Sequence, residues 1–74
     1  MKHHEIEDLS RSELENLIDE YVHHARNREI LKRRLLDGAL YKEIAAEFHL
    51  DYDYTRKLIH KEEDKLFRKI QKNR

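Results

Sequence analysis

The chain has 74 residues, with one glycine, no proline and no cysteine. A chain of this length forms one small domain with a single core, and the near absence of glycine and proline favours long helices. Without cysteine the chain has neither a disulfide framework nor a thiolate metal site, which fits an intracellular, cytoplasmic protein. No apolar run is long enough for a membrane span or a secretory signal, so we expect no membrane association.

Charged residues make up 43% of the chain, and 16 basic residues balance 16 acidic ones. The two signs are separated along the sequence. Residues 1–25 hold seven acidic and two basic side chains, whereas residues 26–74 hold nine acidic and 14 basic ones. An acidic N-terminal segment followed by a basic remainder predicts that only one part of the surface faces polyanions.

The first predicted helix begins after Ser10, because Ser10 and Glu13 have the spacing of a capping box. An apolar stripe continues from there at helical spacing through Leu14, Leu17, Ile18, Tyr21 and Ala25. Residues 1–8 lack any such pattern. We therefore expect a flexible N-terminus over residues 1–8, followed by a single helical domain over residues 9–74.

Two shorter helices are predicted next, over about residues 27–37 and about residues 41–48. The inner face of the first of them consists of Ile30, Leu31 and Leu35, with Leu36 alongside. Gly38 follows this helix, at a position where a left-handed backbone conformation commonly ends a helix. In the helix over 41–48, Ile44, Ala45 and Phe48 share one side.

The last predicted helix is long and covers residues 51–72. Asp51 is a good N-cap, and nothing in the sequence stops the helix before about Lys72. Its apolar stripe is interrupted by the acidic run Glu62-Glu63-Asp64, and consists of Leu58, Ile59, Leu66, Phe67 and Ile70. Together these segments predict an all-α domain of four helices.

Residues 41–60 have the spacing of a helix-turn-helix, in which two helices meet at a wide angle across a short turn. Ala45 is the small residue needed where the second helix crosses the first. The residues placed to fill the angle are Ile44, Phe48, Leu50, Thr55 and Leu58. His49 occupies the turn position that usually needs a positive φ, which histidine tolerates at some cost. A structural hairpin that binds no nucleic acid can imitate this spacing.

Residues 28–70 resemble region four of bacterial sigma factors, and the small phage and mobile-element proteins that carry this region alone. The residues that carry the resemblance are Leu35-Leu36-Asp37-Gly38, Glu43-Ile44-Ala45 and the segment TRKLIHKEEDKL over 55–66. The resemblance implies a sigma-region-four-like helix-turn-helix that binds double-stranded DNA in a sequence-specific manner. It also implies transcription regulation in a phage or mobile element, and contact with RNA polymerase.

The chain departs from the family pattern at several positions. Leu40 stands where the family often has threonine as N-cap, so Glu43 lacks its capping-box partner, at an expected cost of about 1 kcal/mol. Thr55 replaces an aliphatic residue, and Glu62 and Glu63 replace small and apolar ones. Nothing upstream resembles the other sigma regions, so a complete sigma factor is not expected.

In a helix-turn-helix the second helix inserts its first turns into the major groove. Counted from the Asp51 cap, the predicted DNA-binding residues are Tyr52, Asp53, Arg56, Lys57, His60 and Lys61, with Lys42 from the preceding helix. Arg56 is the candidate for pairing with guanine, and Asp53 can accept from cytosine and reject other bases. Lys57 can read a guanine or hold a phosphate. Arg33 and Arg34 either add non-specific attraction or pair with the acidic first helix.

A protein–protein interaction module is the alternative function. The same scaffold could bind RNA polymerase, or form a homodimer through Leu66, Phe67 and Ile70. We do not expect an enzyme, because the sequence has no phosphate-binding glycine loop, nucleophile elbow or cysteine. No cofactor is expected either. Adjacent histidines, His3-His4 and His23-His24, point about 100° apart on a helix and have no suitably spaced third ligand, so no metal site is expected.

Overall fold

The structure is a computed structural model that describes residues 9–72. Within this range the chain is all-helical, with four α-helices and no strand. The helices are α2 (Arg11–Tyr21), α3 (Ala25–Leu35), α4 (Tyr41–Glu47) and α5 (Tyr52–Lys72). The predicted all-α, four-helix fold class is thus confirmed, while the flexible N-terminus expected over residues 1–8 lies outside the described residues.

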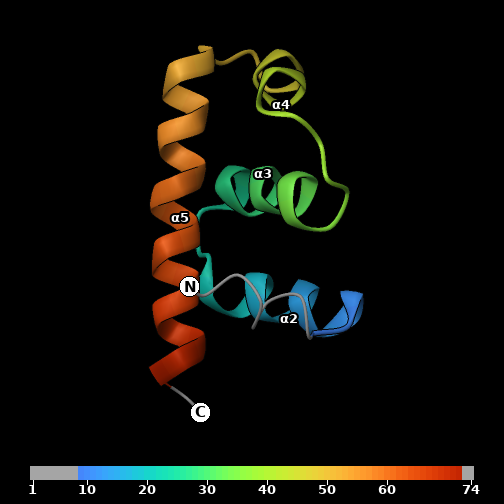
Figure 1. Ribbon diagram of the computed structural model, residues 1–74, viewed down its shortest axis with the longest axis vertical. Coiled ribbons are helices and arrows are strands. Elements are labelled where there is room, and N and C mark those ends of the chain that lie inside the picture. The colour runs from blue at the N-terminus through green and yellow to red at the C-terminus, as the bar shows by residue number, and fades with distance from the viewer. Residues whose placement is uncertain (1–8, 73–74) are drawn as a thin grey trace.

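Helix α5 runs the length of the molecule along one side, and the three shorter helices are stacked against it (Figure 1). Helix α4 lies beside the beginning of α5, α3 beside its middle and α2 beside its end (Figure 1). At a rise of about 1.5 Å per residue, α5 is about 30 Å long. One face of α5 is therefore covered by three helices, and the opposite face is open to solvent.

The capping box of α2 forms as predicted. The Ser10 hydroxyl oxygen accepts from the Glu13 amide at 3.2 Å, and the Glu13 carboxylate accepts from the Ser10 amide at 2.9 Å. The predicted continuation of the stripe to Ala25 is wrong. Helix α2 ends at Tyr21 because Val22 turns to an extended backbone and buries its side chain, and Ala25 is an exposed residue that begins α3.

The two predicted positive-φ positions are confirmed. Gly38 has φ +70° in the connection between α3 and α4, and His49 has φ +57° in the turn between α4 and α5. Helix α3 spans Ala25–Leu35, two residues earlier at each end than the predicted 27–37. The start of α3 has no side-chain cap, because His24 makes no capping bond, which leaves its position poorly marked in the sequence. At the other end the left-handed Gly38 closes the helix, with the Ala39 amide donating to the Arg33 carbonyl at 3.1 Å.

At the start of α4, Leu40 offers no side-chain acceptor, so only half of a capping box can form. The Glu43 carboxylate still accepts from the Leu40 amide at 2.8 Å. The expectation that Glu43 would be left without a partner is therefore only partly right. The Glu43 amide is the group that lacks a capping acceptor.

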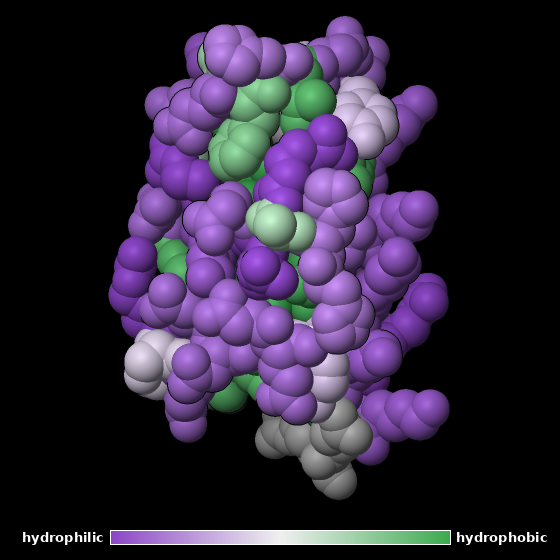
Figure 2. All heavy atoms as spheres, turned by 180° about the vertical axis from the view of Figure 1, so that it is seen from behind, coloured by the Kyte–Doolittle hydropathy of each residue, from purple (hydrophilic) through white to green (hydrophobic). Residues whose placement is uncertain are grey.

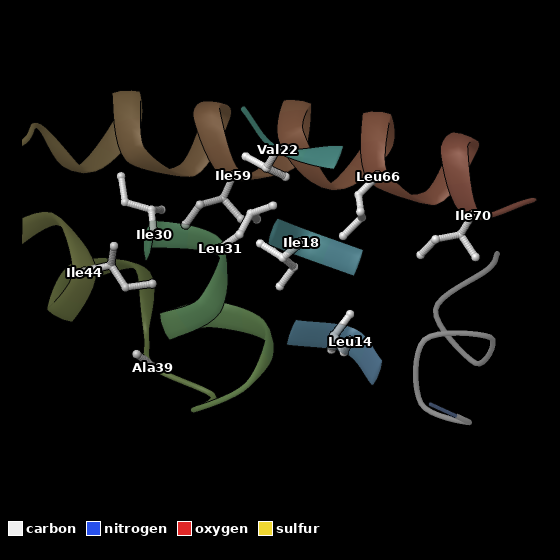
Figure 3. Packing of buried hydrophobic residues seen from close by; sticks show 10 residues of the cluster. All are labelled: Leu14, Ile18, Val22, Ile30, Leu31, Ala39, Ile44, Ile59, Leu66 and Ile70. Carbon is white, nitrogen blue, oxygen red and sulfur yellow. The ribbon is translucent and has the colours of Figure 1, made fainter. Parts of the chain in front are cut away.

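Aliphatic side chains from every helix meet in one core (Figure 3). Ile44 of α4 points towards Ile30 of α3 and Ile59 of α5, and farther along α5 Ile70 lies near Leu14 of α2 (Figure 3). The acidic run of α5 does not interrupt this packing: Glu63 is on the buried face with 6% of its surface exposed. Each fully buried isoleucine or leucine contributes about 1.5–3 kcal/mol to folding, which holds α4 against α5.

Candidate nucleic-acid interface

The first turn of α5 is fixed by Asp51 and Thr55. The Asp51 carboxylate accepts from the Tyr54 amide at 3.2 Å, so Asp51 is the N-cap as predicted. Thr55 is fully buried, and its hydroxyl donates to the Asp51 carbonyl at 2.8 Å. Thr55 therefore fills the angle between α4 and α5 as the aliphatic residue of the family pattern would, while its hydroxyl is hydrogen-bonded within its own helix.

Helices α4 and α5 are separate helices that cross one another (Figure 1). The contact is made by Ile44, which is fully buried, and Ala45, which is 6% exposed, with Phe48 partly buried beside them. The Ala45 carbonyl accepts from the Leu50 amide at 2.8 Å, which closes the turn around His49. These contacts set the direction in which α5 leaves α4, and with it the surface that the first turns of α5 present.

All seven sequence-predicted DNA-binding residues lie at or near the protein surface. Six of them are exposed, namely Lys42, Tyr52, Asp53, Lys57, His60 and Lys61. The seventh, Arg56, keeps 42% of its side chain exposed. Lys57 and Lys61 are one turn apart on the face of α5 that points away from the core, and Lys42 is in the first turn of α4.

Arg56 is held only loosely. Its guanidinium lies 3.8 Å from the carboxylate of Asp53, one turn earlier, which is itself 71% exposed. An exposed pair at this separation contributes little to stability, so Arg56 can leave it at small cost. The two predicted base-reading side chains thus lie next to one another on the surface of α5.

His60 is part of a stack that connects α5 to α4 and α3. The Tyr41 hydroxyl and the His60 Nε2 are 3.4 Å apart, and the two rings are tilted with centroids separated by 5.9 Å. On the Tyr41 ring lies the guanidinium of Arg34, 4.1 Å from the ring centroid. Arg34 also donates to the Ala39 carbonyl at 2.9 Å. His60 is thus placed at the edge of the candidate surface by contacts that a cation–π pair supports.

The alternative that Arg33 and Arg34 pair with the acidic first helix is wrong. Arg33 forms a bidentate pair with Glu47 of α4, at 2.8 and 2.6 Å, because the last turn of α3 lies beside α4 rather than α2. This pairing raises the pKa of Arg33 and lowers that of Glu47. The charge of Arg33 is therefore neutralised by Glu47, whereas Arg34 contacts the Ala39 carbonyl and the Tyr41 ring and pairs with no carboxylate of residues 9–72.

Two other cations of α3 pair with α2 instead. The Lys32 ammonium lies 2.8 Å from the Asp19 carboxylate, and hydrogen bonding to Asp19 raises the pKa of Lys32. Arg28 lies 3.7 Å from the same carboxylate and donates to the Val22 carbonyl at 3.0 Å. These two cations of α3 thus compensate part of the acidic charge of α2 and help to hold α2 against α3.

The outward-facing lysines of α5 differ from the paired cations of α3. Within residues 9–72, Lys57 and Lys61 form no ion pair, whereas Arg28, Lys32 and Arg33 of α3 all do. Both residues are exposed, so their ammonium groups are accessible to an external anion. The structure therefore concentrates unpaired positive charge on α5, although the chain as a whole is neutral.

Tyr54, in the first turn of α5, is exposed, with 48% relative accessibility. Arg26 of α3 donates to its hydroxyl at 3.2 Å, and the guanidinium lies 5.9 Å from its ring centroid. Tyr54 and Arg26 thus extend the surface formed by the start of α5 on the side of α3. Their meeting depends on where α3 begins, which the sequence does not indicate.

Two of the three residues proposed for self-association, Leu66 and Ile70, are buried within the domain. Leu66 and Ile70 are 1% and 7% exposed and belong to the core, so they cannot meet a second copy. The rear face of the molecule is mostly hydrophilic, with hydrophobic residues in small patches (Figure 2). The largest of these patches lies towards the end where α4 meets the beginning of α5 (Figure 2).

Residues 9–72 contain no group of three or more potential ligands that could hold a metal ion. The pair His3-His4 lies outside the described residues. None of the helices described combines the length and the apolar character that a membrane crossing requires. Comparisons with protein-family models, with the sequences of known proteins and with solved structures find no match.

Proposed function

We propose that α4, the turn around His49 and α5 form a helix-turn-helix of the kind found in region four of bacterial sigma factors. In this proposal the chain binds double-stranded DNA in a sequence-specific manner and regulates transcription in a phage or mobile element. The observation that supports it most directly is the distribution of charge. Lys57 and Lys61 project, unpaired within residues 9–72, from the open face of α5, while Arg28, Lys32 and Arg33 of α3 are paired with carboxylates.

The proposed mechanism places the first three turns of α5 in the major groove. Arg56 leaves its loose pair with Asp53 and donates two hydrogen bonds to a guanine, because a guanidinium matches the two acceptors on that base edge. Lys57 and Lys61 neutralise phosphates on either side of the groove, and Lys42 of α4 contacts the backbone. Asp53 then accepts from a cytosine amino group and disfavours sequences that place a phosphate or an acceptor there.

The decisive experiment selects bound duplexes from a random DNA pool and then measures affinity for the selected duplex by fluorescence anisotropy. Replacing Arg56 with alanine should lower the specific affinity by about 1–3 kcal/mol, or roughly five- to 150-fold. Affinity for unrelated duplexes should change much less. In a salt series, Lys57→Ala should reduce the slope of log affinity against log salt by about one phosphate contact.

Arg68→Ala is the matched control, because it removes an exposed guanidinium from the same helix three turns farther on. The proposal predicts that Arg68→Ala keeps the specific affinity within about twofold. If no duplex is enriched, or if both arginine variants lose affinity equally, the helix-turn-helix assignment is wrong. Retention of RNA polymerase on immobilised protein that binds no DNA would favour the interaction-module alternative instead.

A further inference from the structure

A groove separate from the start of α5 lies between the connection of α2 to α3 and the C-terminal half of α5. Its volume is about 600 Å³, within the range of roughly 300–1,000 Å³ that is common for small-molecule sites. His23 and His24 line one wall, and Tyr21 contributes an aromatic ring. The other wall is α5, which supplies Lys65, Arg68, Lys69 and Lys72.

The charge of this groove is strongly positive. Its four cationic side chains all belong to exposed residues of α5, and within residues 9–72 none of them pairs with a carboxylate. The ammonium of Lys69 lies 5.8 Å from the Tyr21 ring centroid, which places it over the aromatic ring. The one carboxylate that lines the groove is that of Glu62, which accepts a hydrogen bond from the side-chain amide of Asn27 in α3 at 3.1 Å.

We propose that this groove binds a small anion made of linked phosphates. Four cations within about two turns of one helix are spread over only about 10 Å, so an occupant must carry several negative charges in a short length. A chain of phosphates does so, and its oxygens accept hydrogen bonds from ammonium, guanidinium and imidazole groups alike. The proposal also gives a role to the His23-His24 pair, since His24 makes no capping bond to α3 and its side chain is available to the groove.

The groove is distinct from the proposed DNA surface. Lys57 and Lys69 are separated by 12 residues of the same helix, which corresponds to about 18 Å along the axis and a rotation of about 120°. A straight duplex whose major groove holds the first turns of α5 would not also fill a concave site that faces another direction. The occupant is therefore a free phosphate compound and not the flanking backbone of the same duplex.

The test uses the whole chain labelled with ¹⁵N and titrated with sodium tripolyphosphate at constant ionic strength. Saturable shifts are expected in the amide signals of residues 21–24 and 62–72, together with a higher melting temperature. A second titration with adenosine triphosphate distinguishes an inorganic chain from the phosphates of a nucleotide, because a base that stacks beside Tyr21 adds ring-current shifts to the proton signals of its ring that tripolyphosphate cannot produce.

Two pairs of substitutions separate this site from the DNA surface. Lys65→Ala with Arg68→Ala should weaken tripolyphosphate binding by at least about tenfold, because two charges near the anion are lost. Arg56→Ala with Lys57→Ala should leave tripolyphosphate binding within about twofold of the original chain. All four residues are exposed or partly exposed, so both double variants should keep the circular dichroism spectrum of the folded protein.

Shifts spread evenly over all lysines, or equal losses in both double variants, would mean general charge attraction and would overturn the proposal. If Lys65→Ala with Arg68→Ala instead weakens binding to the selected duplex, the groove is part of the DNA contact. Because each pair of substitutions is measured against both ligands, failure of the phosphate site leaves the helix-turn-helix proposal standing, and the reverse also holds.

Discussion

Replacing Gly38 with alanine should destabilise the domain through its backbone alone. Gly38 has φ +70°, and a Cβ atom placed there meets no heavy atom within 4 Å, so no steric contact is added. The left-handed conformation costs a residue with a Cβ roughly 1–2 kcal/mol. Reduced freedom of the unfolded chain returns about 0.4–1 kcal/mol. The net loss in the free energy of unfolding should thus be about 1 kcal/mol.

The loss is measured by equilibrium unfolding in urea, followed by far-ultraviolet circular dichroism. In a thermal scan of the same variant, a loss of this size should lower the melting temperature by about 4–8 °C. His49 provides the reciprocal test, since it is exposed and has φ +57° in the turn before α5. His49→Gly should stabilise the domain by up to about 1 kcal/mol. A loss above about 3 kcal/mol for Gly38→Ala, or destabilisation by His49→Gly, would refute the reasoning from backbone conformation.

Two further predictions concern caps and carboxylates. Leu40→Thr should complete the capping box with Glu43 and raise the free energy of unfolding by about 1 kcal/mol in the same urea assay, because Leu40 is half exposed and little apolar burial is lost. Hydrogen bonds from Arg11 and then Arg33 lower the pKa of Asp37, and one from Arg33 lowers that of Glu47. Carboxylates whose pKa is lower in the folded state stabilise it fully above their unfolded values, so stability should fall as pH drops below about 4.5. A melting-temperature series in pH should show a smaller fall for Arg33→Gln, and an equal fall would contradict the assigned pairs.

The parts of the fold that the sequence predicts well are those decided within a few residues. The Ser10 cap, the Asp51 cap and the left-handed conformation of Gly38 each follow from local hydrogen bonding or from the steric freedom of one residue. The position of the break between α2 and α3 does not follow from local signals, because neither glycine nor proline marks it. It is decided by the burial of Val22, which is a long-range contact.

In the candidate site, too, features decided within one helix follow from the sequence, whereas contacts between helices do not. The exposure of Lys57 and Lys61 follows from their register on a helix whose apolar face is evident in the sequence. The partners of Arg33 do not follow, because Glu47 is 14 residues away and meets it only when α3 and α4 lie side by side. The contact between Arg26 and Tyr54 also depends on the neighbouring helix, since Arg26 lies in the first turn of α3.

A neutral chain can still bind a polyanion if its charges are arranged in the right way. Here Asp19 of the acidic helix α2 is paired with Arg28 and Lys32 of α3, at 3.7 and 2.8 Å, so part of the negative charge of α2 is compensated locally. Had the cations of α5 been those that faced α2, the open surface would have been neutral or acidic. Interactions between exposed charges are largely screened beyond about 8–10 Å at physiological salt, so an anion responds mainly to the charges close to it. The acidic helix packs beside the end of α5, about 20 Å from its first turns, and so offers little repulsion to an anion bound there.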